Sequence, residues 1–194
     1  MLDSVLVNFW RFIQTKTRLN SLCLILRIII FGFLIISYNK STSNALFMNL
    51  THSVKAFQEL TVNELYDLLK LRSEVFVVEQ NCVFLDQDDK DQKCFHVLLY
   101  SDDLLVGYSR LVPAGLSYTE IAIGRVITSL SVRGKGLGKV VMELSIKYCH
   151  TLFGEGNIRL GAQTYAKGFY ASLGFVADGA VYDEDGIEHI EMVR

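Results

Sequence analysis

The sequence predicts a mixed α/β domain that occupies the last three quarters of the chain and follows a hydrophobic leader. Helix-like segments alternate with short strand-like runs, and no segment of the chain is repeated. Two of these runs, 94–100 and 104–112, are joined by a tight turn, which favours antiparallel pairing. A third strand, at 120–130, leads through a glycine-rich loop into a helix. With 194 residues, of which 51% are hydrophobic, the chain can bury one sizeable core.

The first predicted helix covers 61–73. It begins at a capping box, in which Thr61 is the N-cap residue and the Glu64 side chain reaches back to it. Apolar residues then recur at helical spacing (Val62, Leu65, Leu68, Leu69 and Phe76). An apolar run and a polar loop follow, and we expect the acidic residues of this loop, Asp86–Asp91, to be solvated.

The second half of the domain is predicted from its glycines and its apolar pattern. A helix at 137–152 ends at Gly154-Glu155-Gly156, and its apolar residues share one face (Leu137, Val141, Leu144, Tyr148 and Leu152). After it we expect a short buried strand, a helix ended by Gly174, and two β-like runs beside a turn (157–163, 165–173, 175–177, 189–193 and 183–186).

Charge and cysteine usage exclude several classes of protein. The formal net charge is −2, and residues 1–47 hold five cations and one anion, so residues 48–194 carry −6. An acidic domain argues against general nucleic-acid binding and is compatible with a cationic or amine substrate. The four cysteines show no C-x-x-C spacing, so we expect free thiols in a reducing compartment and no metal site (Cys23, Cys82, Cys94 and Cys149).

The leader, 1–47, contains the apolar run Leu22–Ile36, which resembles a signal anchor or a short transmembrane helix. The run is shorter than the ~20 residues that span a bilayer. Arg27 near its centre also costs about 2.5–3.5 kcal/mol on insertion. Three hypotheses stay open: a membrane anchor, a cleaved signal, and a dispensable leader before a true start at Met48. In each, 48–194 is a self-sufficient domain.

The segment 131–140, SVRGKGLGKV, has the composition of a phosphate-binding loop. It is not a P-loop, because Gly138-Lys139 is followed by Val140 and the hydroxyl that binds magnesium is absent. It is not a dinucleotide fingerprint either, because that spacing requires glycine at position 139. What remains is Arg133-x-x-Gly136-x-Gly138 at a helix N-terminus, where backbone N–H groups can converge on an anion. The alternative is an ordinary basic turn.

Four ordered blocks resemble the ElaA-like subgroup of the GNAT N-acetyltransferases, whose acyl-CoA pyrophosphate motif is R-x-x-G-x-G. They are LRSEVFVVEQNC (71–82), IGRVITSLSVRGKGLG (123–138), LGAQTYAKGFYASLGF (160–175) and VYDEDGIEHIEM (181–192). The likeness covers about residues 50–194, and the leader has no counterpart in it. It implies the GNAT acyl-CoA N-acyltransferase fold, an α/β (α+β) arrangement with a mixed, mostly antiparallel central sheet flanked by helices.

The resemblance also implies acetyl-CoA as co-substrate. The strand before the loop, ending at 127–132, would pair with the pantetheine arm through its main chain and polarise the thioester carbonyl. The implied cofactor contacts are Ile127, Leu130, Val132, Arg133, Gly134, Lys135, Gly136, Leu137, Gly138, Lys139 and Gln163.

Proton transfer requires an acid for the leaving thiolate and a base for the amine. In the block Phe169–Phe175, which matches F-Y-x-x-x-G-F, the resemblance implies Tyr170 as the acid, although Tyr170 could instead only pack on the cofactor. The candidate bases are Glu79, Asp86, His96, Glu120 and His189, and of these Glu79 and His189 lie in family blocks. The two histidines could equally be satisfied strand residues, and Arg72 is expected to be a buried tether between helix and loop.

The function implied is a cytoplasmic acetyl-CoA:amine N-acetyltransferase in which the amine attacks directly in a ternary complex. A membrane-tethered, non-catalytic acyl-CoA-binding or sensing module is the alternative, with membrane association through 22–36. An acyl-homoserine-lactone synthase, which has a related fold, ranks lower. The amine and the oligomeric state stay open.

Overall fold

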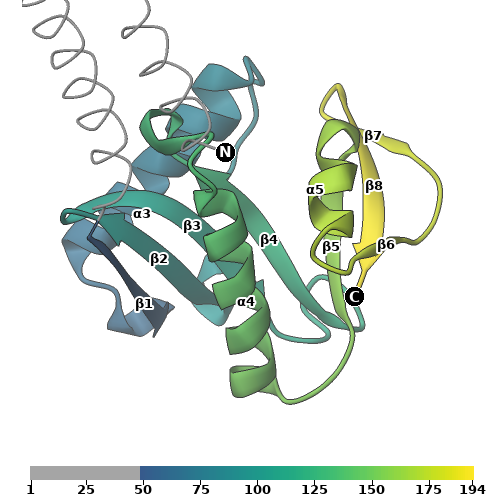
Figure 1. Cartoon of the computed structure of the whole chain (residues 1–194), viewed down its shortest axis with the longest axis horizontal. Helices are drawn as coiled ribbons and strands as arrows, with labels where there is room; N and C mark the ends of the chain where they lie inside the picture. Colours follow the sequence, from purple (N-terminus) through teal and green to yellow (C-terminus); the bar gives the residue numbers. More distant parts are fainter. Residues whose placement is uncertain (1–48) are drawn as a thin grey trace, which may run out of the picture. The chain divides into compact units, whose positions relative to one another are not determined.

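The computed structural model describes residues 49–194, and Figure 1 labels its elements. The described residues form eight strands: Leu50–Ala56 (β1), Phe95–Ser101 (β2), Leu104–Val112 (β3), Ile121–Thr128 (β4), Ile158–Gln163 (β5), Val176–Ala177 (β6), Tyr182–Glu184 (β7) and Ile187–Val193 (β8). Their α-helices are Val62–Arg72 (α3), Leu137–Phe153 (α4) and Lys167–Ala171 (α5). Short helical turns of other kinds lie at Phe57–Glu59 (η1), Ser73–Glu79 (η2), Asp91–Lys93 (η3), Leu130–Val132 (η4) and Thr164–Ala166 (η5).

The strands form one sheet in the order β1-β2-β3-β4-β5-β8-β6, with β7 paired to β8. Strands β4 and β5 run parallel, and every other neighbouring pair is antiparallel. Helix α4 is the crossover between the two parallel strands (Figure 1). The predicted fold class, a mixed and mostly antiparallel sheet flanked by helices, is therefore confirmed.

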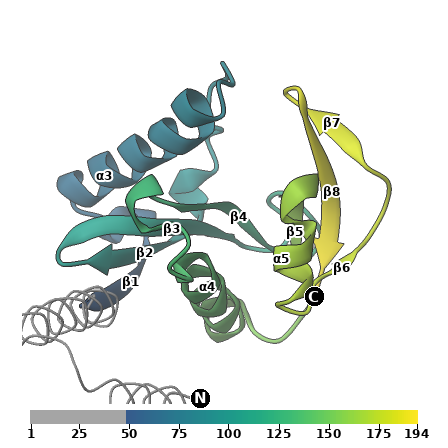
Figure 2. The same ribbon diagram turned by 45° about the horizontal axis from the view of Figure 1, so that its top comes forward.

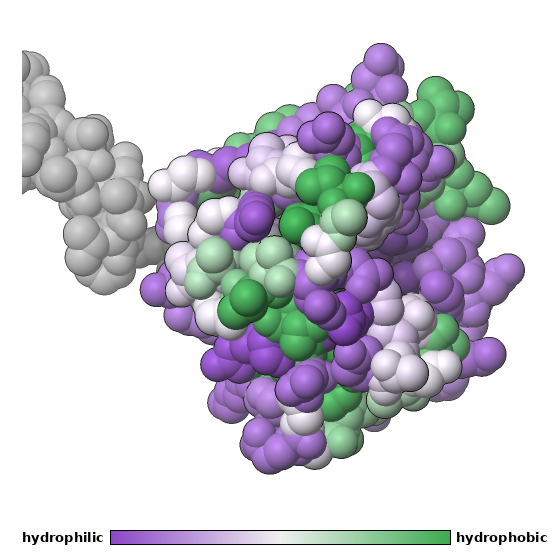
Figure 3. All heavy atoms as spheres, turned by 90° about the vertical axis from the view of Figure 1, so that its right-hand side faces the viewer, coloured by the Kyte–Doolittle hydropathy of each residue, from purple (hydrophilic) through white to green (hydrophobic). Residues whose placement is uncertain are grey.

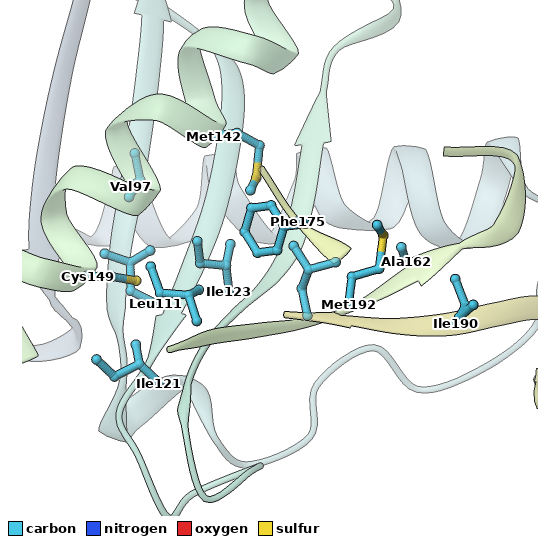
Figure 4. Packing of buried hydrophobic residues seen from close by; sticks show 12 residues of the cluster. Val97, Leu111, Ile121, Ile123, Met142, Cys149, Ala162, Phe175, Ile190 and Met192 are labelled. Carbon is cyan, nitrogen blue, oxygen red and sulfur yellow. The ribbon is translucent and has the colours of Figure 1, made fainter. Parts of the chain in front are cut away.

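Helices cover both faces of the sheet, with α3 on one side and α4 on the other (Figure 2). Between α4 and the sheet lies the larger core, in which Met142 of α4 sits beside Phe175 and Ile123 (Figure 4). Between α3 and the sheet, Leu68 and Leu71 pack against Leu98 and other strand residues. Burying apolar side chains on both faces stabilises the sheet and holds its strand ends in place.

Strands β4 and β5 stay together over only two residue pairs, Ile121 with Ile158 and Ala122 with Arg159. Beyond that point β4 carries a β-bulge, where it has one more residue than β3 between matched pairs. Arg125, in this bulge, adopts a left-handed backbone conformation with φ 53°. Because a bulge bends its strand and increases the local twist, the two strands diverge toward their carboxyl ends.

Helix α3 starts where the capping box predicts: Thr61 Oγ1 accepts from the Glu64 N–H at 3.2 Å, and the Thr61 N–H donates to Glu64 at 2.8 Å. The helix then continues as a π-helical turn, η2, through Glu79. Such turns are frequent at functional sites. This one carries Phe76 and Glu79 to the carboxyl end of β4, where both line a cleft.

Several boundaries differ from those predicted. Strand β1 was not expected, because LTHSVKA lacks a clear apolar alternation. The strand predicted at 120–130 ends at Thr128, and Leu130–Val132 forms a 3₁₀ turn in place of a strand end. Helix α5 is shorter than the predicted 165–173, since residues 164–166 form a separate 3₁₀ turn.

The leader 1–47, Met48 and the apolar run Leu22–Ile36 lie outside the described residues. Within 49–194, none of the helices combines the length and the apolar character needed to cross a membrane.

Candidate active site

A cleft with a volume of about 750 Å³ opens where β4 and β5 diverge. Its walls come from η2, β4, β5, the β7–β8 hairpin and the loops beside them. Gly124, Val126 and Thr128 line it from β4, and Gly161 and Gln163 line it from β5. Because the two strands are not paired here, their facing backbone groups are available to a bound molecule.

The glycine-rich loop stands beside this cleft and leads into α4. Gly134 and Gly136 have positive φ values, 75° and 81°, which glycine adopts without steric cost. Gly136 is the N-cap of α4, and no side chain caps the helix. Within residues 49–194, the amides of Gly134, Gly136, Leu137 and Gly138 have no hydrogen-bond acceptor. Free amides at the positive end of a helix are suited to binding an anion.

Cations surround the loop. Lys135 and Lys139 are exposed, and Lys139 lies 3.7 Å from Glu143, one helical turn away. Arg133 lines the cleft, where its guanidinium forms a two-pronged ion pair with Glu79; Nη2 lies 2.8 Å from Oε2. The guanidinium also contacts the Thr128 carbonyl oxygen at 3.3 Å. Glu79 therefore holds Arg133 against the end of β4.

The remaining predicted cofactor residues fall into two groups. Ile127 and Gln163 line the cleft, and the Gln163 amide pairs reciprocally with that of Gln80 from across it, at 3.3 and 3.4 Å. Leu130 and Val132 belong to the η4 turn, where Leu130 is 65% exposed and Val132 is buried. These two are therefore not in a strand end, contrary to the prediction.

Tyr170, the predicted acid, lies on α5 and lines the cleft. Its ring packs edge-on against Phe169 and Phe175, as part of the larger core. Burial raises the pKa of Tyr170 to about 12, with a further contribution from Tyr165. The phenol is therefore protonated over the physiological range and can donate a proton.

The five predicted base candidates have very different surroundings. Asp86 is buried and bonded to two arginines, and the buried His96 has both ring nitrogens hydrogen-bonded. Glu120 is bonded to Arg159 and does not line the cleft. Only Glu79 and His189 of the five line the cleft.

His189 is the candidate base whose reactive atom is free. Its Nδ1 lies 2.8 Å from the carbonyl oxygen of Ile187, which can only accept, so Nδ1 carries the proton. In the neutral ring Nε2 then has the lone pair, and it has no hydrogen-bond partner within 49–194. The ring stacks on Tyr182 at 5.8 Å between centroids. Glu79, in contrast, uses both oxygens on Arg133.

The acidic loop 86–91 is not the solvated segment expected. Asp86 and Asp91 are buried, and with Asp88 they form a network with three arginines from α3, β3 and β4 (Arg72, Arg110 and Arg125). Arg72, which is completely buried, bonds Asp86 at 2.6 Å and Asp91 at 2.8 Å, as expected of a tether. The network holds the loop against the end of α3, against β3 and against the bulge of β4.

Several cleft residues were not singled out from the sequence, notably Gln80, Phe84, Tyr118 and Tyr182. Tyr118 lies in the loop before β4 and Tyr182 on β7, so no spacing in the chain connects them. Within the described part of the chain, no group of His, Cys, Asp or Glu side chains is arranged to hold a metal ion. The three described cysteines are free (Cys82, Cys94 and Cys149).

Comparisons with known proteins agree with this geometry. The family model for the acetyltransferase (GNAT) domain matches residues 68–194. Protein ElaA of Escherichia coli (strain K12) is 41% identical over 138 residues, which cover 70% of this chain and 90% of ElaA. The crystal structure of Escherichia coli ElaA aligns with a TM-score of 0.70 and 38% identity, over 75% of this chain and 99% of that one.

A crystal structure of an acyl-CoA N-acyltransferase from Pseudomonas aeruginosa is equally similar, with a TM-score of 0.71 and 38% identity. The alignment covers 75% of this chain and 99% of the Pseudomonas aeruginosa protein. GNAT proteins are acyltransferases that use acyl-CoA, and the open β4–β5 edges and the uncapped α4 N-terminus suit such a molecule. The chain belongs to the GNAT acetyltransferase family, among its ElaA-like members.

Proposed function

We propose that the protein is an N-acetyltransferase that moves an acetyl group from acetyl-CoA to a primary amine. The observation that carries this proposal is that two features of the structure lie next to each other. Four amides without an acceptor lie at the N-terminus of α4, and an unpaired stretch of β4 and β5 opens beside them. A diphosphate joined to an extended amide-containing arm matches both.

In this proposal the loop 133–139 binds the pyrophosphate through its backbone amides, and Lys135 and Lys139 supply charge. Arg133 turns toward the phosphates from its pair with Glu79, so Glu79 acts as a positioning residue rather than as the base. The pantetheine arm pairs with the open edge of β4 near Ile127, and Gln163 contacts it from β5. Leu130, Val132 and Leu137 contribute backbone rather than side-chain contacts.

The chemistry then needs only proton transfers and a polar environment. A neutral amine nitrogen attacks the thioester carbonyl carbon, a C–N bond forms, and the C–S bond breaks. Amides of β4 stabilise the charge that develops on the carbonyl oxygen. Tyr170 donates its proton to the leaving thiolate, and Nε2 of His189 accepts the proton that the nitrogen loses. Exchange with solvent restores both groups.

The test uses the full-length chain. We expect acetyl-CoA to raise the melting temperature, and we expect release of free CoA thiol when members of a broad amine panel are added. Absence of stabilisation by acetyl-CoA would contradict the cofactor assignment. Binding without turnover of any amine would favour the acyl-CoA sensor. Faster turnover with long acyl donors than with acetyl-CoA would favour the acyl-homoserine-lactone synthase.

A further inference from the structure

The half of the cleft away from the glycine-rich loop contains two tyrosines directed at one glycine of β5. A Cβ atom on Gly161 would lie 2.9 Å from the Tyr182 hydroxyl oxygen and 3.8 Å from that of Tyr118. Both hydroxyls therefore lie close to the same point of the strand, and only glycine leaves room there for the Tyr182 hydroxyl. Neither hydroxyl has a hydrogen-bond partner within 49–194, although both side chains line the cleft.

These tyrosines adjoin the reactive end of the cleft. The Tyr182 ring stacks on His189, and His189 is the register partner of Gln163 on β5. On β5, Gly161 and Gln163 alternate with the buried Leu160 and Ala162, so the glycine faces away from the core on the same side as Gln163. An acceptor whose nitrogen reaches His189 would therefore extend across Gly161, between the two phenol groups.

The half of the cleft that contains Tyr118 and Tyr182 is surrounded by negative charge. Residues 182–191, which form β7 and most of β8, contain five carboxylates and no lysine or arginine. Glu184 lines the cleft, and its carboxylate lies 3.9 Å from Nδ1 of His189. Arg159, whose guanidinium lies 5.8 Å from the centre of the Tyr118 ring, is itself bonded to three carboxylates (Glu120, Asp178 and Glu191). On the side that carries β6 and β7, hydrophilic residues surround separate apolar patches (Figure 3).

Both phenols stay neutral in this environment. Burial, followed by the nearby Tyr118, Glu184 and Glu191, raises the pKa of Tyr182 to about 12. Burial and the charges of Glu191 and Glu184 likewise raise the pKa of Tyr118. Neutral phenol oxygens can accept hydrogen bonds from an ammonium group, and their rings attract cations. The loop end of the cleft, with its free amides and lysines, has the opposite preference.

We propose that Tyr118, Tyr182 and Glu184 form a subsite over Gly161 for the distal cation of an unbranched α,ω-diamine, whose other nitrogen is acetylated. The proposal rests on the acetyltransferase function above and names the class of its acceptor. The phenols and the carboxylate bind the distal ammonium, while His189 deprotonates the reacting nitrogen. The two ends of the cleft then separate the two substrates by charge, the anionic CoA at α4 and the cationic amine at the β7–β8 hairpin.

The test compares three acceptors of matched length: 1,5-diaminopentane, 1-aminopentane and 5-aminopentanoate. We expect kcat/KM for the full-length protein to be at least about tenfold higher for the diamine than for the monoamine, and lowest for the anionic amino acid. Glu184→Gln should reduce the preference for the diamine over the monoamine, expressed as the ratio of their kcat/KM values, at least about fivefold. Gly161→Ala should raise KM for the diamine without changing KM for acetyl-CoA, because its methyl group displaces the Tyr182 hydroxyl.

Glu188→Gln is the matched control, because Glu188 belongs to the same hairpin but does not line the cleft. It should leave the preference unchanged. Equal turnover of all three acceptors, or equal effects of Glu184→Gln and Glu188→Gln, would overturn the subsite while leaving the acetyltransferase intact. Acetyl-CoA binding without turnover of any amine would overturn both.

Discussion

At the scale of single residues, the cleft gives different surroundings to Tyr170 and His189, the proposed acid and the proposed base. Tyr170 is held among aromatic side chains, which keeps its phenol protonated, whereas His189 has one nitrogen committed to the Ile187 carbonyl and the other free. A direct transfer from thioester to amine requires one group that donates a proton and one that accepts it, and these two side chains are our candidates for the two roles.

Replacing Tyr170 with phenylalanine should remove the proposed proton donor while keeping the packed ring. We expect Tyr170→Phe to lower kcat about 10²-fold, in the range of general acid catalysis, and to change the Kd for acetyl-CoA less than about threefold. Steady-state kinetics and a binding titration measure the two quantities. Because the pKa of Tyr170 is about 12, wild-type kcat should show no loss from this group below about pH 10.

Tyr165→Phe is the control for this prediction, because Tyr165 lines the same cleft but is largely exposed. A similar drop in both variants would show that hydroxyl loss acts on solvation of the cleft rather than on proton donation.

At the scale of elements, features that depend on residues close together in the sequence were predicted correctly. Contacts between residues far apart in the sequence were not. The capping box of α3 and the glycine loop before α4 depend on residues within one turn, and both occur as expected. The acidic loop 86–91 was misjudged because its arginine partners lie up to 39 residues away, so no local pattern distinguishes it from a solvated loop. The ion pair between Glu79 and Arg133, 54 residues apart, escaped prediction for the same reason.

The buried face of helix α4 was also predicted only in part. Its buried residues are Leu137, Val141, Met142, Ser145 and Cys149, whereas Leu144, Tyr148 and Leu152 of the predicted face are only partly buried or exposed. The buried face is rotated from the predicted one and includes Ser145, which contacts Ser109 of β3 with the two hydroxyl oxygens 2.6 Å apart. A hydropathy pattern counts serine as polar and cannot anticipate a partner across the core.

The glycine loop can be tested by a change of charge alone. Gly136→Asn and Gly136→Asp introduce side chains of nearly equal size at the same left-handed position, so both carry a similar backbone strain of about 1 kcal/mol. We expect Asp to weaken acetyl-CoA binding at least about tenfold more than Asn, since its carboxylate would repel the pyrophosphate. Calorimetric Kd values measure the difference, and equal affinities of the two variants would contradict an anion site at α4.

At the scale of the whole molecule, the network of three arginines and three aspartates connects α3, β3, β4 and the acidic loop. Three of its members, Asp88, Arg110 and Arg125, line the cleft. Arg125, in the bulge of β4, bonds Asp86 at 2.7 Å. The same side chains therefore stabilise the fold and determine the shape of the cleft.

Arg72→Met should leave two buried carboxylates without their central partner. We expect the free energy of unfolding to fall by about 3–5 kcal/mol, the cost of breaking a buried ion pair from one side. Urea denaturation measures it, with Lys70→Met on the exposed face of the same helix as the control. A loss below about 1 kcal/mol for Arg72→Met would show that the aspartates are stabilised without it.

Acid should weaken the same network. Burial alone would raise the pKa of Asp88, but hydrogen bonds and charge from Arg110 outweigh it and lower the pKa from 3.8 to about 2. Because the pKa is lower in the folded state, the Asp88 carboxylate stabilises the fold at pH values above its unfolded-state pKa of 3.8. This stabilisation is lost as the pH falls toward the folded-state pKa of about 2. The melting temperature of wild type should therefore exceed that of Asp88→Asn at pH 6, and the gap should close between about pH 4 and 2.

The divergence of β4 and β5 also affects how the sheet can associate with other chains. Most sheets expose unpaired strand edges at their rims, where charges, prolines or short strands discourage pairing with foreign chains. This sheet has a pair of such edges in its interior, beyond Ala122 and Arg159. Any extended chain that entered could complete the hydrogen bonding that the fold leaves open. On the proposed function, the donor substrate completes it instead, so the molecule that is consumed in the reaction also conceals a site vulnerable to aggregation.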